Sequence, residues 1–144
     1  MPNQDAFTCV PADLISVFAE IQCREPIFHT TEFGTTLSDF EQILDSGYWE
    51  VGASGRRYSR EFILGTLAQY PPVNAISAGW CTYDYGIRRL GTDAYLFTYT
   101  LRQNDRVTRR ATIWQTTPGG WRILYHQGTM VASEEDDVVP RRSA

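Results

Sequence analysis

Lysine is absent from this chain of 144 residues, and arginine supplies all 13 of its strongly basic side chains. The absence excludes a lysine nucleophile or a lysine Schiff base from any chemistry that the protein performs. The 17 acidic residues leave a net charge of −4, which gives no electrostatic indication of nucleic-acid binding. We therefore expect no nucleic-acid partner.

Cysteines and long apolar runs are also scarce. The three cysteines, Cys9, Cys23 and Cys81, are odd in number, and their spacing fits neither a zinc site nor a CxxC redox pair. The start of the sequence lacks a signal-peptide pattern, and no apolar run approaches the roughly 18 residues that a membrane-spanning helix needs. These features predict free, buried thiols in a soluble cytoplasmic protein with no membrane partner.

Hydrophobic and aromatic residues are plentiful. They make up 42% and 13% of the chain, which is enough for one hydrophobic core and favours strands and pocket walls. Neither a repeat nor a linker is visible, so we expect a single domain over residues 1–132. The segment 133–144 mixes acidic and basic residues with few apolar ones, and it is predicted to be a flexible tail.

Helical patterns occupy the first half of the chain. Apolar residues recur at helical spacing within residues 10–29, 35–47 and 59–72. Pro26 is expected to kink or end the first helix. A short strand, residues 48–54, lies between the second helix and the third.

The period changes to that of strands after Pro72. Four strands are predicted within residues 75–91, 93–103, 106–117 and 120–131, with Gly-rich or Asn/Asp-containing turns between them. Helices followed by consecutive strands indicate an α+β fold, in which a curved antiparallel sheet packs three helices on one face.

Two phrases of the sequence carry a resemblance to a known family. "YWEVGASGRRYSREF" at residues 48–62 and "IWQTTPGGWRILYHQGT" at residues 113–129, taken with the order of elements, are similar to the nuclear transport factor 2-like superfamily. They most resemble its SnoaL-like, DUF4440-type branch of unknown function. The resemblance covers about residues 12–131. It implies a cone, in which a strongly bent sheet wraps around the three helices.

The resemblance implies two kinds of function. Some relatives are isomerases, dehydratases or cyclases that act on apolar ligands with a carboxylate or histidine base, and others are dimerisation or binding modules. We therefore expect a small, partly apolar ligand in the cone, with proton transfer of the isomerase or lyase type as one outcome. The alternative is a non-catalytic homodimer or partner-binding module. No cofactor is expected, and the fold alone does not choose between these functions.

Glu50 is the first candidate catalytic residue, because it stands alone among aromatic and β-branched residues. On a strand it shares a face with Tyr48, whereas Trp49 lies on the other face. If the Trp49 face packs on the helices, Glu50 points outward. If the sheet wraps the other way, Glu50 faces into the cone, where burial would raise its pKa and suit it to act as a base. The competing interpretation is an ion pair with Arg56, Arg57 or Arg60.

The two histidines, His29 and His126, complete the candidate catalytic set, because imidazole titrates near neutral pH. The competing interpretation is that both are hydrogen-bonded packing residues. A metal site would need both histidines and one of Glu25, Glu32 or Glu50 to meet, and no metal is expected.

The neighbours of these histidines are also predicted. Alternation along the strand places His126 on the same face as Leu124. Glu25 precedes His29 by four residues, so a carboxylate–imidazole pair forms if the helix continues through Pro26.

Aromatic residues of the strands supply most of the remaining candidates. Tyrosine hydroxyls can polarise a ligand carbonyl, although most such rings pack in a core or interface. Tyr83 and Tyr85 are expected to share a face. The candidate ligand-binding residues are Glu25, Trp49, Tyr83, Tyr99 and Trp114.

A homodimer through the sheet is favoured by apolar side chains on both faces of one strand, with Leu96 on one face and Tyr95, Phe97 and Tyr99 on the other. Solvated side chains are expected at Arg88, Arg102, Arg109 and Arg110.

Overall fold

The computed structural model describes residues 6–32, 34–133 and 137–138, so most of the predicted tail lies outside the described residues. The helices are α1 (Ile15–Gln22), α2 (Leu37–Ile43) and α3 (Arg60–Gln69), with short 3-10 turns at η1 (Ala6–Thr8) and η2 (Ala12–Leu14). The strands are β1 (Leu44–Val51), β2 (Arg57–Ser59), β3 (Cys81–Arg89), β4 (Ala94–Gln103), β5 (Arg106–Thr117) and β6 (Gly120–Met130).

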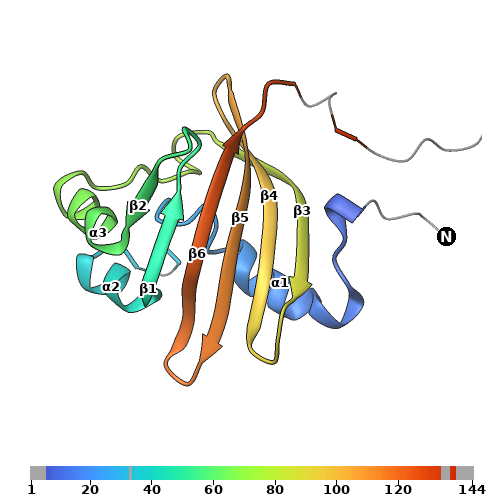
Figure 1. Ribbon diagram of the computed structural model, residues 1–144, viewed down its shortest axis with the longest axis horizontal. Coiled ribbons are helices and arrows are strands. Elements are labelled where there is room, and N and C mark those ends of the chain that lie inside the picture. The colour runs from blue at the N-terminus through green and yellow to red at the C-terminus, as the bar shows by residue number, and fades with distance from the viewer. Residues whose placement is uncertain (1–5, 33, 134–136, 139–144) are drawn as a thin grey trace, which may run out of the picture.

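The six strands form one curved sheet in the order β2-β1-β6-β5-β4-β3 (Figure 1). The sheet bends around α1, and α2 and α3 lie beside β1 and β2 at the other end (Figure 1). The predicted α+β fold with three helices on one face of a curved sheet is confirmed. We call the face toward the helices the inner face and the opposite one the outer face.

One strand pair departs from the expected antiparallel pattern. β1 and β6 run parallel, so the sheet is mixed. A parallel pair needs a long connection between its strands, and residues 52–119, which include α3 and three further long strands, provide it.

The helices begin where the sequence offers a cap. The Thr36 side chain accepts a hydrogen bond from the Asp39 backbone N–H, and the Asp39 carboxylate accepts one from the Thr36 N–H, which forms a capping box at the start of α2. α1 ends at Gln22, well before Pro26. None of the helices in the described residues is long and apolar enough to cross a membrane.

Three segments differ from the sequence prediction. Residues 44–47, predicted to lie in the second helix, instead begin β1, because α2 ends at Ile43. Residues 57–59 turn back on β1 as the short strand β2. Residues 75–80 form a loop rather than the start of β3, because Ala75 N–H donates to the His29 carbonyl and Trp80 N–H donates to the Ala75 carbonyl. The backbone hydrogen bonds of this loop therefore close locally and against the segment after α1.

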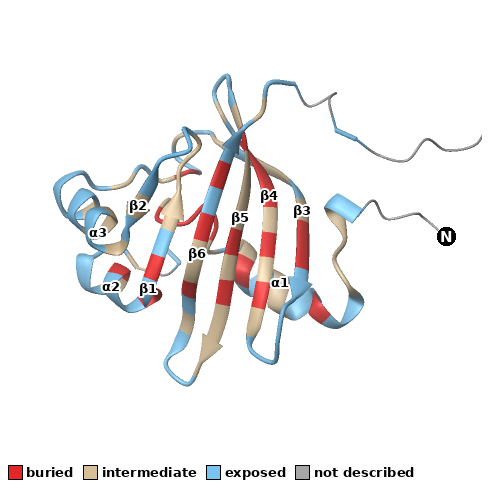
Figure 2. Ribbon diagram, viewed as in Figure 1, coloured by how far each residue is buried: buried red, intermediate tan, exposed pale blue. Residues whose placement is uncertain are grey.

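The hydrophobic core lies between the inner face and the helices, where buried residues alternate along the central strands (Figure 2). Its fully buried side chains include Phe97, Leu101 and Trp114 from the sheet and Leu14 and Ile21 from the first helical segment. Burial of each large apolar side chain stabilises the fold by roughly 1.5–3 kcal/mol. The same interior also holds a few polar side chains, which need hydrogen-bond partners there.

The cysteine prediction is right about free thiols and wrong about their burial. All three cysteines are free, but Cys23 and Cys81 are exposed. Cys23 lies just past the end of α1, where its thiol donates to the Glu20 carbonyl. Cys81 begins β3, which is an edge strand, so one side of it meets solvent.

Candidate functional site

Glu25 is a carboxylate in the core, with only 6% of its surface exposed. Its Oε1 accepts hydrogen bonds from the Ile27 N–H at 3.0 Å and the Tyr99 hydroxyl at 2.9 Å, and its Oε2 accepts one from Trp114 Nε1 at 3.1 Å. The Thr112 hydroxyl also bonds to it. Burial nevertheless raises the pKa of Glu25 from 4.5 to about 7, because the loss of hydration outweighs the four hydrogen bonds.

The predicted Glu25–His29 pair does not form, because α1 ends at Gln22 and the two side chains take other partners. His29 Nδ1 bonds to the Val73 carbonyl at 2.6 Å, and its ring packs edge-on against Trp80. Burial lowers the pKa of His29. His29 therefore ties the segment after α1 to the loop before β3. Among the described residues, no group of three histidines, cysteines or acids could hold a metal ion.

His126 is 2% exposed and bonds through both ring nitrogens. Its Nδ1 lies 2.7 Å from Thr112 Oγ1, and its Nε2 lies 3.4 Å from a terminal nitrogen of Arg110. A guanidinium only donates, so Nε2 accepts and Nδ1 carries the proton. Thr112 then accepts from His126 and donates to Glu25. The result is a directed chain of hydrogen bonds from Arg110 through His126 and Thr112 to Glu25.

His126 is neutral in this chain. Burial, together with the positive charge of Arg110, lowers its pKa from 6.5 to about 3. Because Nε2 is already occupied and the ring resists protonation, His126 is poorly suited to act as a base. It holds its neighbours in place instead.

A β-bulge in β6 determines which way His126 points. Adjacent residues of β5 pair with Tyr125 and Ile123, which leaves Leu124 as the extra residue. His126 therefore shares the inner face with Ile123, and the prediction that it shares a face with Leu124 is wrong. Strict alternation fails here because the bulge shifts the register by one residue.

Glu50 also lies on the inner face, which settles the orientation that the sequence left open. It pairs with His126 across the β1–β6 ladder, and its Oε1 accepts a hydrogen bond from the Tyr48 hydroxyl at 2.7 Å. Burial raises the pKa of this half-buried carboxylate, while the Tyr48 bond and the charge of Arg110 oppose the shift. Burial and the Glu50 charge also raise the pKa of Tyr48.

The downstream arginines do not pair with Glu50 in the described part of the chain. Arg60 donates to the backbone carbonyls of Glu41 and Leu44, which fixes the start of α3 against the end of α2. Arg56 and Arg57 are exposed. Within the described residues, the hydrogen-bond partner of the Glu50 carboxylate is therefore the Tyr48 hydroxyl.

Two of the candidate ligand-binding residues lie on the outer face, away from the others. Trp49 is 45% exposed and packs against the ring of Tyr125. Tyr83 faces outward as well, because Asp84 adopts φ 56 within a bulge of β3 and turns Tyr85 inward. The prediction that Tyr83 and Tyr85 share a face is therefore wrong, and only Glu25, Tyr99 and Trp114 of the ligand-binding set meet inside.

Arg110 joins the inner groups, so the prediction that its side chain is solvated is wrong: it is half-buried and bonds to Thr108 and His126. It lies opposite Tyr99 and Gly128 in the neighbouring strands. A Cβ at Gly128 would stand 3.4 Å from Arg110 Cδ and Nε, so this glycine gives the arginine side chain room beside β6. A signal was present in the sequence, since adjacent Arg109 and Arg110 on one strand must point to opposite faces.

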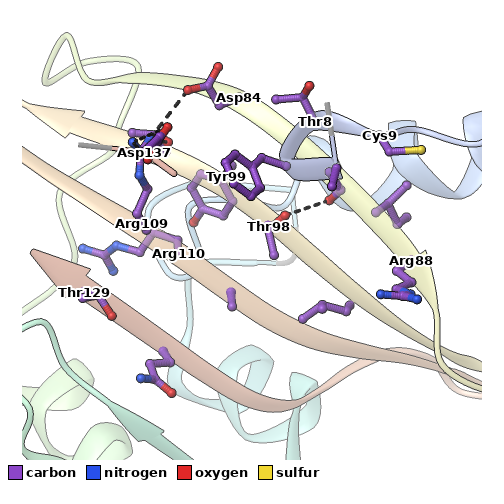
Figure 3. Close-up of a pocket in the computed structure, with 18 of the residues that line it drawn as sticks. Thr8, Cys9, Asp84, Arg88, Thr98, Tyr99, Arg109, Arg110, Thr129 and Asp137 are labelled. Carbon is purple, nitrogen blue, oxygen red and sulfur yellow. Dashed lines mark hydrogen bonds and ion pairs between the residues drawn. The ribbon is translucent and has the colours of Figure 1, made fainter. Parts of the chain in front are cut away.

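A groove of about 960 Å³ lies on the outer face (Figure 3). It is bounded by residues 6–11 and by side chains of β3 to β6. Arg109 stands in it and forms ion pairs with Asp84 and Asp137, at 3.6 and 3.2 Å. Most of its lining side chains, Arg109 among them, lie on the outer face, although Tyr99 and Arg110 also contribute to the lining. Glu25, Glu50, His29 and His126 are not part of it.

Comparison with known proteins identifies the architecture. No family model matches the sequence, and no curated protein matches it. Solved structures do match. A DUF3225-family protein of unknown function from Pectobacterium atrosepticum is 21% identical, with 85% of this chain and 94% of that chain covered and a TM-score of 0.61. A cystatin-like fold protein from Burkholderia xenovorans is 15% identical over 85% and 95% of the two chains, with a TM-score of 0.64.

A third similar structure has the fold that the resemblance implied. It is a nuclear transport factor 2-like protein from Cytophaga hutchinsonii, 15% identical over 81% of this chain and 96% of that chain, with a TM-score of 0.56. The chain has the nuclear transport factor 2-like fold. All three identities are below 25%, so the similarity of this chain to these solved structures shows the fold alone. The DUF4440-type branch stays a prediction.

Proposed function

We propose that this nuclear transport factor 2-like protein binds a small, partly apolar molecule at the inner polar site, which we define as Glu50, His126, Arg110 and His29. The observation that carries the proposal is the convergence of these groups. Glu50 pairs with His126 across two strands, and Arg110 bonds to His126. The charge of Arg110 also acts on the pKa values of Glu50 and His29. Such a cluster in a small core is typical of a binding site.

Glu50 is the group of this site best suited to exchange a proton with a ligand. Tyr48 holds one of its carboxylate oxygens, which leaves Oε2 as an acceptor, and burial raises the pKa of Glu50 above its usual value. His126 is occupied at both nitrogens, and His29 is occupied at Nδ1. We propose Glu50 as the base, with His126 as a positioning residue.

Binding is tested by nuclear magnetic resonance with neutral single-ring probes, benzyl alcohol and benzamide. The indole N–H of Trp114 reports on the interior, because it donates to Glu25, and that of Trp49 reports on the outer face. We expect at least one probe to shift the Trp114 signal in a saturable way. Shifts confined to Trp49, or no saturable shift at all, would contradict the proposal.

The role of Glu50 is tested with Glu50→Gln, which keeps the size of the side chain and removes its charge. We expect it to weaken binding of benzyl alcohol, whose hydroxyl donates to the carboxylate, several-fold. Glu41→Gln on the exposed side of α2 is the matched control, and it should leave the affinity unchanged. Equal affinities for the wild type and Glu50→Gln would remove Glu50 from the site.

A homodimer through the outer face is the second candidate function. The exposed Trp49, which packs on the half-buried Tyr125, favours it, whereas Tyr95, Phe97 and Tyr99 do not, because they are buried on the inner face. Sedimentation equilibrium should show a monomer–dimer exchange that Trp49→Arg shifts toward monomer. A wild-type monomer at all concentrations up to the millimolar range would contradict this candidate.

A further inference from the structure

Arg110 presents a positive charge to the inner face without an ion-pair partner. Its Nε donates to Thr108 Oγ1 at 2.9 Å, and one terminal nitrogen contacts His126 at 3.4 Å. Both partners are neutral. Among the described residues, no carboxylate lies within ion-pair distance of Arg110, and its second terminal nitrogen has no hydrogen-bond partner.

The two inner carboxylates are engaged elsewhere. Glu25 accepts four hydrogen bonds from Tyr99, Trp114, Thr112 and the backbone, and the Tyr48 hydroxyl binds Glu50. A half-buried cation is costly when it lacks a counter-charge. The neighbouring Arg109, on the outer face, has the counter-charges that Arg110 lacks, because it forms ion pairs with two carboxylates.

The side chain of Arg110 is nevertheless held in a defined position. Thr108 fixes Nε, His126 fixes one terminal nitrogen, and the open face of Gly128 accommodates the guanidinium stem. The chain through Thr112 to Glu25 orients His126 in turn. A guanidinium fixed in this way, with one N–H edge unused, is suited to bind an anionic oxygen.

We propose that the ligand of the inner polar site is a small organic carboxylate, and that Arg110 binds its carboxylate group. The inference rests on the function proposed above and names the ligand class. The ligand carboxylate has two oxygens. One can accept from the unused guanidinium nitrogen of Arg110, and the other can meet the protonatable carboxyl of Glu50. Two aromatic residues contact groups of the site, Tyr48 at Glu50 and Trp80 at His29, and they favour an organic body over an inorganic ion.

The binding should depend on pH through the groups that face Arg110. The charge of Arg110 acts on Glu50 of β1, Tyr99 of β4, His126 of β6 and His29 of the segment after α1. Two more titratable groups adjoin these, since Tyr48 bonds to Glu50 and Glu25 bonds to Tyr99. When Glu50 is protonated, it can donate to the bound carboxylate, and its charge no longer competes for Arg110. Affinity for a carboxylate should therefore rise as the pH falls through the raised pKa of Glu50.

The test compares benzoate with benzamide, which has nearly the same shape and no charge, in titrations followed at the Trp114 indole. In the wild type we expect benzoate to bind about tenfold more tightly or better, as for a charge-assisted hydrogen-bonded pair. Arg110→Gln should abolish this preference, and Arg110→Lys should retain part of it. Arg109→Gln is the matched control, because it removes the adjacent arginine from the outer face, and it should leave the preference unchanged.

The outcomes separate the two proposals. If benzamide and benzoate bind the interior equally well, or if Arg110→Gln keeps the preference for benzoate, the ligand class is wrong and small-molecule binding stands. If neither probe reaches Trp114, both proposals fail. If Arg110→Gln does not fold, the comparison of benzoate with benzamide in the wild type, and its pH dependence, decide. A ratio near one between the two affinities at pH 5 overturns the inference without any variant.

Discussion

Glu25 shows how a single carboxylate can be kept in the core of a small protein. Four donors surround it, but burial still raises its pKa to about 7. A raised carboxyl pKa means that its stabilising contribution is complete below about pH 4.5 and is lost as the pH rises to about 7. The difference between 4.5 and about 7, at 1.36 kcal/mol per pH unit, corresponds to about 3 kcal/mol.

The first prediction concerns the variant Glu25→Gln, whose amide cannot titrate. We expect Glu25→Gln to be less stable than the wild type at pH 4.5. The NH2 of the new amide can only donate hydrogen bonds, and it would meet side chains that are themselves donors. Its deficit should shrink by about 3 kcal/mol between pH 4.5 and pH 7, as the wild type alone loses stability. Urea unfolding across this pH range measures the difference in unfolding free energy between the two proteins. The titration of His126 contributes equally to both and cancels in this difference.

Glu20→Gln is the control for this experiment, because Glu20 lies on the exposed side of α1. It should follow the pH dependence of the wild type. A constant stability difference between Glu25→Gln and the wild type from pH 4.5 to pH 7 would show that Glu25 titrates normally.

The second prediction concerns the proton on His126. Because Arg110 can only donate to Nε2, the ring should be the Nδ1–H tautomer and stay neutral at pH 5, consistent with a pKa of about 3. Long-range proton–nitrogen spectra of the imidazole show both properties, and His126→Asn assigns the signals. An imidazolium at pH 5, or an Nε2–H tautomer, would break the proposed chain at this residue.

At the scale of elements, the N-terminal segment is held against the edge of the sheet. Ile87 N–H donates to the Cys9 carbonyl at 3.1 Å. Gly86 lets the two segments approach, since a Cβ there would stand 2.9 Å from Thr98 Oγ1 and 3.0 Å from the Phe7 carbonyl oxygen. The absence of a side chain at Gly86 therefore determines whether η1 packs on β3.

The third prediction follows from this close approach. Gly86→Ala should displace residues 6–9 from β3, so the Ile87 amide should exchange with solvent at least about tenfold faster, as expected when a local hydrogen bond opens more often. Gly65→Ala is the control. No atom lies within 4 Å of the added methyl in α3, and the change should stabilise the protein by about 0.5–1 kcal/mol. Unchanged exchange at Ile87 in Gly86→Ala would refute the packing argument.

The elements themselves were largely predictable, because their signals are local. Helical spacing predicted α3, which Ser59 caps in the structure, and alternation with turn residues predicted β4 to β6. The sequence predicted less well on which face of the sheet an individual side chain lies. The bulges at Asp84 and Leu124 each insert one residue, and that single step moved Tyr83 outward and His126 inward.

At the scale of the whole molecule, the sheet separates two chemical environments. His126 and Arg110 lie on the inner face and Glu25 lies buried opposite that face, whereas Arg109 stands in the groove of the outer face. Sequence could nominate Glu25, Glu50 and the histidines by residue type. It could not show that Arg110 joins them, because that contact depends on strands paired across a curved sheet.

The most direct test of the account is a crystal structure of the protein soaked with benzoate near pH 5. We expect the carboxylate at Arg110 on the inner face, with one oxygen near Glu50 and the ring among core side chains. Benzoate found only in the outer groove at Arg109, or an interior that stays closed around Arg110 at saturating benzoate, would contradict it.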